Sequence, residues 1–204
     1  MTNLTENKPT AMAALRILGM ALLLTVASVF TARAQQVALK TNLLYDATTT
    51  PNLGVEVSMG RRSTAQVVYA LNPWKFSHAE TKQLRHWLLM PEYRHWFCQK
   101  FNGAFLGVHA LGGQFNIGGI DLPLPVFDDL DQNRYEGWFA GAGVSFGYQW
   151  LLSRHWNLEA GIGLGYLRFH YKQFPCTECG ALIQETNKNY FGPTKLALSV
   201  MYCF

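Results

Sequence analysis

The chain has 204 residues, of which 49% are hydrophobic and 14% aromatic, but only 15% are charged. A soluble domain usually carries about 25% charged residues, so this composition argues against a charge-rich cytosolic enzyme, and the aromatic content argues against disorder. A formal net charge of +4 is too small to indicate the basic surface of a nucleic-acid-binding protein.

The first 34 residues resemble an export signal. Lys8 and Arg16 give a positive start, residues 17–30 are almost all apolar, and Ala32 to Ala34 supply small residues for cleavage. A membrane anchor is the alternative, but a spanning helix needs roughly 20 apolar residues. We therefore predict a cleaved signal peptide over 1–34 and an exported domain over 35–204.

Eight segments of the exported domain alternate between large apolar residues and small or polar ones. This period of two is typical of β-strands that present two different faces. It is clearest in residues 135–150, where one phase is apolar and the other is rich in glycine. The predicted strands are 37–45, 52–59, 63–71, 83–97, 103–115, 135–150, 156–171 and 196–204.

The connections alternate as well. Tight turns are predicted at 60–62, 98–102 and 151–155, and long loops at 71–82, 116–134 and 172–189, with the shorter connection 46–51 on the long-loop side. This asymmetry is typical of outer-membrane barrels. The predicted fold is all-β: an eight-stranded antiparallel up-and-down transmembrane β-barrel.

A soluble lipocalin-like barrel, apolar inside and polar outside, is the alternative architecture. It is disfavoured because the apolar phase of 140–150 carries no charge, whereas glycines and charges share the other phase. In the membrane barrel the apolar phase faces lipid, and aromatic residues near strand ends form interfacial girdles. The candidates are Tyr45, Tyr69, Trp87, Trp138, Tyr148, Trp150, Trp156, Tyr166 and Tyr202.

The inward phase gathers three bases and three acids: Lys40, Glu56, Glu92, Arg94, Glu159 and Lys195. Unpaired charges in a narrow interior cost several kcal/mol each. We therefore interpret these residues as a structural cluster of salt bridges that closes the barrel. The alternative is a gated ion path or a proton-transfer site, for which an eight-stranded interior has little room.

The predicted loops contain three further constellations. Cys176 and Cys179 form a C-x-x-C in the last loop, where we expect a local disulfide rather than redox chemistry or a zinc site. Ser77 and His78 with Glu80 lack the surroundings of a hydrolase nucleophile. The aspartates of 116–134 lack the spacing of an EF-hand, and the apolar run 123–127 between them is a candidate contact surface.

We expect Cys98, Cys203 and His109 to have structural rather than catalytic roles. Cys98 and Cys203 are both predicted at the tight-turn end, but on opposite sides of the barrel, so a bond between them is not expected. His109 has no evident nucleophile beside it. We predict no catalytic residues, no metal and no cofactor.

The last residues alternate toward a terminal aromatic. Leu196, Leu198, Val200, Tyr202 and Phe204 share one phase and resemble the C-terminal signal that the barrel-assembly machinery of bacterial outer membranes recognises.

The exported domain resembles an uncharacterised family of small outer-membrane β-barrel proteins of Bacteroidales, domain of unknown function family 3575. The resemblance covers about residues 37–204. It is carried by Lys40-Thr41-Asn42-Leu43-Leu44-Tyr45-Asp46, Pro51-Asn52-Leu53-Gly54-Val55-Glu56, Pro91-Glu92-Tyr93-Arg94, Gly112-Gly113-Gln114-Phe115, and Gly141-Ala142-Gly143 with Gly147-Tyr148.

The resemblance implies an outer-membrane barrel without an established activity. Members of the family often lie beside genes for fimbrillin-type pili, which makes fimbriae a partner by neighbourhood rather than by chemistry. We expect a monomer in the outer membrane whose loops contact lipopolysaccharide, a surface protein or fimbriae. A lipid A-modifying enzyme is the alternative function.

Overall fold

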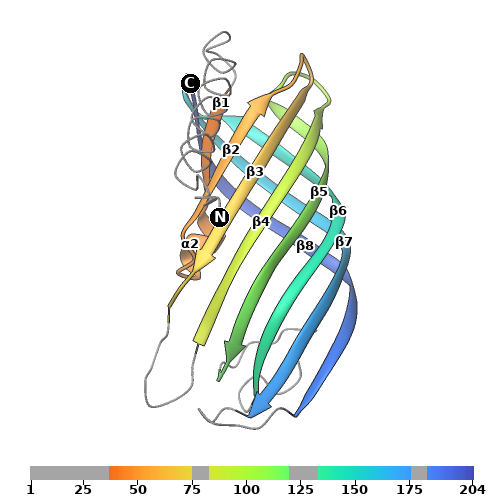
Figure 1. Cartoon of the computed structure of the whole chain (residues 1–204). Helices are drawn as coiled ribbons and strands as arrows, with labels where there is room; N and C mark the ends of the chain where they lie inside the picture. Colours follow the sequence, from red (N-terminus) through yellow and green to blue (C-terminus); the bar gives the residue numbers. More distant parts are fainter. Residues whose placement is uncertain (1–36, 75–82, 120–132, 176–182) are drawn as a thin grey trace, which may run out of the picture. The chain divides into compact units, whose positions relative to one another are not determined.

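The computed structural model describes residues 37–74, 83–119, 133–175 and 183–204. These residues form eight strands and one short helix, α2 (Leu43–Ala47), and Figure 1 shows how they are arranged. The strands are β1 (Val37–Asn42), β2 (Asn52–Ser58), β3 (Ser63–Asn72), β4 (Gln83–Trp96), β5 (Gly103–Gly118), β6 (Asn133–Leu151), β7 (Trp156–Pro175) and β8 (Gln184–Cys203). None of the helices in the described part of the chain is long and apolar enough to cross a membrane.

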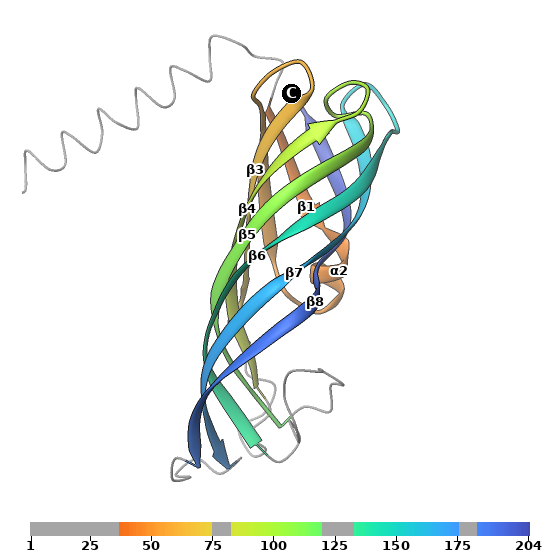
Figure 2. The same cartoon turned by 90° about the vertical axis from the view of Figure 1, so that its right-hand side faces the viewer.

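The strands follow one another around a closed barrel in the order β1 to β8. Every neighbouring pair is antiparallel, and β1 closes the ring by pairing with β8, where Ala38 lies opposite Cys203 and Asn42 opposite Ser199. Figure 2 shows the strands running obliquely around the barrel. The predicted all-β, eight-stranded antiparallel architecture is confirmed.

The strands at the long-loop end extend further than the sequence predicts. β7 continues to Pro175, and β8 begins at Gln184 rather than at residue 196, so much of the predicted loop 172–189 is strand. The start of β8 is rich in polar residues on both phases and contains Pro193, which resembles a loop. Proline is tolerated in a strand where its missing N–H needs no partner, and the β7–β8 register shifts beside Leu164, the partner of Pro193.

Alternation along the strands separates an inner and an outer face. The sequence of β5 does not show which alternate residues face the interior, because both sets contain large apolar side chains. In the structure Phe105, Leu111 and Phe115 are buried inside, whereas Leu106 and Val108 are about half exposed outside. The glycine-rich phase of β6 also faces inward. A Cβ on Gly143 would collide with the β7 backbone at Leu164 and lie 2.9 Å from the Cα of Gly165, so the barrel wall curves too tightly there for a side chain.

The interior has two layers. Toward the long-loop end it is apolar, with a cluster that includes Met90, Leu111, Phe115 and Phe169. Tyr45, predicted for an aromatic girdle, instead lies on α2 and packs against this cluster. Toward the tight-turn end the interior is polar and charged.

Candidate functional site

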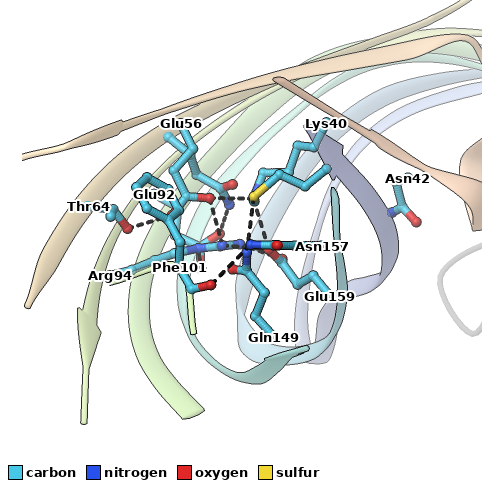
Figure 3. Close-up of polar contacts among 12 residues, drawn as sticks. Lys40, Asn42, Glu56, Thr64, Glu92, Arg94, Phe101, Gln149, Asn157 and Glu159 are labelled. Carbon is cyan, nitrogen blue, oxygen red and sulfur yellow. Dashed lines mark hydrogen bonds and ion pairs between the residues drawn. The ribbon is translucent and has the colours of Figure 1, made fainter. Parts of the chain in front are cut away.

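The charged layer contains all six residues that the inward phase predicts: Lys40 on β1, Glu56 on β2, Glu92 and Arg94 on β4, Glu159 on β7 and Lys195 on β8. Each has a relative exposure of 5% or less. Residues from five strands meet because their alternation points them at the same level of the barrel axis. Figure 3 shows Arg94 reaching across the interior toward Glu56 and Glu159.

Arg94 is the centre of this ion cluster. Its Nη2 lies 2.7 Å from Glu159 Oε1 and its Nη1 lies 2.8 Å from Glu159 Oε2, which is the bidentate geometry that a guanidinium forms with a carboxylate. Nη1 also donates to Glu56 Oε2 at 3.0 Å, and Nε lies 3.3 Å from Glu92 Oε1. The guanidinium carbon is 4.2 Å from the centre of the Phe105 ring. One side chain therefore ties β4 to β2 and β7.

The two lysines complete the charge pairing. Lys40 Nζ donates to Glu56 Oε2 at 2.7 Å and to Glu159 Oε2 at 3.0 Å, and Lys195 Nζ donates to Glu92. Three positive and three negative side chains thus form one connected network. Such balance is what allows charges to be buried, because an isolated buried charge is far more costly than a paired one.

Neutral groups occupy the remaining carboxylate lone pairs. Thr64 donates to Glu56 at 2.5 Å, Ser145 donates to Glu92 at 2.6 Å, and Gln66 also donates to Glu92. These partners come from β3 and β6. They hold the carboxylates in fixed positions and leave them little capacity to accept a further ligand.

The ion cluster is closed on both sides. Trp96, Phe105 and Met201 are fully buried toward the tight-turn end, and the apolar layer lies on the other side. A cavity of about 20 Å³ beside Lys40 and Arg94 has room for about one water molecule. The arrangement joins the strands across the barrel interior and leaves little free space beside the charged groups.

His109 lies beside the cluster and contacts a hydroxyl group. Its Nε2 is 2.9 Å from the Thr194 hydroxyl, and the side chain is buried. In the described part of the chain no group of three or more His, Cys, Asp or Glu side chains is arranged to hold a metal ion. Cys98 and Cys203 are free thiols, as expected from their separation.

The segment around α2 forms a polar corner whose role the sequence pattern does not indicate. The Asn42 side chain accepts from Leu44 N at the start of α2 and from Leu198 N on β8, and donates to Leu196 O at 3.0 Å. Asn52 donates to Asp46 at 2.9 Å. The corner continues the β1–β8 ladder with side-chain bonds at the point where β1 ends.

The other predicted residues lie on the outer face or outside the described residues. The alternating C-terminal residues face outward, with Leu196 and Phe204 more than half exposed. The signal peptide 1–34, Ser77, His78, Glu80, Cys176, Cys179, the aspartates of 116–134 and the apolar run 123–127 fall outside the described residues.

Comparison with protein-family models gives one assignment. Residues 20–204 match the family described as a protein of unknown function (DUF3575). The chain belongs to this family. The predicted membership of this family is confirmed. The structure gives its motif residues physical roles: Lys40, Glu56, Glu92 and Arg94 belong to the ion cluster, and Asn42, Asp46 and Asn52 to the corner at α2. Searches of curated proteins and of solved structures gave no match.

Proposed function

We propose that the chain is an outer-membrane β-barrel with a structural or interaction role at its long-loop end. The observation that supports this most is the outer face. Large apolar side chains are exposed on every strand, among them Leu39, Leu53, Val55, Val67, Leu89, Leu106, Val108, Val144, Phe146, Ile162, Leu164 and Leu196. A soluble monomer rarely exposes a continuous apolar surface of this extent.

Aromatic residues bound this apolar belt on both sides. Trp150, Trp156 and Tyr202 lie toward the tight-turn end, and Trp87 and Trp138 toward the long-loop end, all facing outward. Between the two aromatic rows the outward positions of the described strands carry a single charged residue, Arg168, which lies beside His170 at the long-loop edge of the belt. Tryptophan and tyrosine favour the level of lipid headgroups.

The belt has the height of a bilayer interior. Trp138 and Trp150 are twelve residues apart on β6. At about 3.3 Å per residue they are about 40 Å apart along the strand, and a tilt of about 45° reduces this to about 28 Å along the membrane normal, close to the roughly 25 Å apolar band of outer-membrane barrels.

The interior supports a structural role rather than a solute pore. The ion cluster joins strands across the barrel, and the apolar layer fills the space toward the long-loop end. We propose a monomer, inserted by the barrel-assembly machinery, whose long-loop end contacts lipopolysaccharide, a surface protein or fimbriae. We propose no enzymatic role, and mass spectrometry of lipid A with and without the protein tests that point: a changed acyl pattern would support the lipid A-modifying alternative.

Fractionation of cells that produce the full-length chain tests the proposal. We expect the protein in the outer-membrane fraction, shortened by the predicted signal peptide, resistant to carbonate extraction, and faster on gels before boiling than after it. A matched variant with Val144→Glu and Phe146→Glu on the outer face should be lost from that fraction. Recovery of the parent protein in the soluble periplasm would refute the proposal.

A further inference from the structure

The outer face is hollowed at the long-loop end. An open pocket of about 810 Å³ is lined by β3 to β8, and side chains of the outward phase provide most of its lining. We call it the outer groove. Its lining includes Arg85, Trp87, Glu136, Trp138, His170 and Lys172.

The outer groove begins where the apolar belt ends. Two cross-strand rows of the sheet lie at this border. Within each row, every residue is the direct partner of the next on the neighbouring strand. The first row is Trp87, Gln114, Trp138, His170 and Asn187, and the second is Arg85, Asn116, Glu136, Lys172 and Glu185. The first contains the two tryptophans and the second alternates bases, amides and acids. If the belt lies in hydrocarbon, the groove lies at the level of the outer-leaflet headgroups.

Contacts within the two rows hold the tryptophans and acids in place. Trp87 Nε1 donates to Gln114 at 3.2 Å, and the Trp138 and His170 ring centroids are 5.8 Å apart. Further contacts fix the acids: Asn116 donates to Glu136 at 3.2 Å, His170 Nε2 lies 3.0 Å from Glu185, and Lys172 Nζ lies 3.7 Å from the same carboxylate. The groove therefore presents oriented aromatic and polar groups.

Two cations at this border have no acidic partner in the part of the chain that the structure describes. Among the described residues no carboxylate lies within ion-pair distance of Arg85 or of Arg168, which occupies the outward position of β7 next to His170. Both side chains are exposed. Free guanidinium groups are suited to bidentate binding of phosphate, and a basic site beside an apolar belt is suited to an anionic lipid headgroup.

The remaining groove chemistry is suited to a sugar. Sugar hydroxyls both donate and accept, and the groove offers carboxylate acceptors at Glu136 and Glu185 with amide groups of both kinds at Gln114 and Asn116. The indoles of Trp87 and Trp138 supply flat apolar surface with a polar edge. A plain phosphate would use the arginines but neither the indoles nor the carboxylates.

We propose that the outer groove binds the phosphorylated sugar headgroup of an outer-leaflet glycolipid, with one exposed arginine, Arg85 in the lining or Arg168 at the belt edge, on the phosphate and Trp87 and Trp138 against the sugar. This rests on the proposed placement in the outer membrane and specifies which lipid the barrel wall contacts.

Native mass spectrometry of the full mature protein in detergent micelles tests the proposal. The added probes are monophosphorylated lipid A, dephosphorylated lipid A, phosphatidylglycerol and inorganic phosphate. We expect monophosphorylated lipid A to bind most tightly. The double variant Arg85→Gln, Arg168→Gln should weaken it by about tenfold, the loss of one charge-assisted hydrogen bond. The matched control is Arg61→Gln, Arg154→Gln, two exposed arginines in the turns of the other end, and it should bind as the parent does.

Three results would overturn the inference: equal binding by both double variants, phosphatidylglycerol binding as tightly as lipid A, or inorganic phosphate binding as tightly as lipid A. Trp138→Phe provides a second test, since it keeps an apolar ring but loses the indole edge and should weaken lipid A without affecting phosphatidylglycerol. Failure of the placement itself is distinguishable, because the parent protein would then stay soluble without detergent.

Discussion

Removal of Arg94 should destabilise the barrel through one identifiable carboxylate. Without Arg94, Glu56 keeps Lys40 and Thr64, and Glu92 keeps Lys195, Ser145 and Gln66. Glu159 loses both bonds of its bidentate pair and retains Lys40, which it shares with Glu56. Glu159 is therefore the group left with inadequate compensation inside the barrel.

The magnitude follows from the burial of the group. Arg94 has a relative exposure of 0% and Glu159 of 1%, and removal of one partner from a buried ion pair costs about 3–5 kcal/mol. We expect a loss of that size in the free energy of unfolding for Arg94→Met, which keeps much of the side-chain volume. Adding Glu159→Gln removes the stranded charge, so the double variant should recover about 1–3 kcal/mol relative to the sum of the single changes.

Urea unfolding of the protein folded in detergent micelles, followed by tryptophan fluorescence and by the mobility of unheated samples on gels, measures these differences. Arg61→Met in the exposed β2–β3 turn is the control for loss of one positive charge. An Arg94→Met barrel as stable as this control would refute the idea that the ion cluster locks the strands. A double variant that loses the full sum would show that Glu159 is not the stranded group.

Three further predictions concern the wall and its assembly. Gly143→Ala should destabilise the folded barrel by about 1–3 kcal/mol through overpacking, whereas Gly60→Ala, where a Cβ meets nothing within 4 Å, should leave the urea midpoint unchanged. Asn42→Ala should cost about 1–3 kcal/mol in the same titration, because it leaves backbone groups of Leu196 and Leu198 without their partner, and an equal midpoint would contradict the role of the corner at α2. Phe204→Ala should lower the amount of folded protein in the outer membrane of cells while refolding in micelles stays normal, and equal amounts in cells would argue against an assembly signal.

Much of the barrel could be predicted because its alternation is strong. In β6 the contrast between apolar and glycine positions predicts both the strand and which of its residues face the interior. The same parity identified the six members of the ion cluster, since an odd or even position in a strand decides the side it faces. Which acid pairs with which base could not be predicted, because the pairs join strands that are not neighbours, such as β4 with β7, and depend on the stagger of the whole barrel.

Other features escaped prediction for physical reasons. The start of β8 lacks an apolar phase, so it resembles a loop even though β7 provides a continuous ladder. Tyr45 looked like an interfacial aromatic, but α2 turns it toward the interior. The outer groove combines residues of six strands, none of which is unusual by itself, and only the cross-strand register brings the two tryptophans and the charged row together.

The direction of the apolar face is the central claim, and collision accessibility of a spin label measures it directly. In a background with the four cysteines replaced by serine, a label is attached at Val144→Cys in the middle of the apolar belt or at Arg61→Cys in a turn, and the protein is reconstituted in lipid vesicles. We predict that dissolved oxygen relaxes the Val144 label strongly and a water-soluble nickel chelate hardly does so, with the opposite order at Arg61. A Val144 label that the nickel chelate reaches as readily as the Arg61 label would contradict the account.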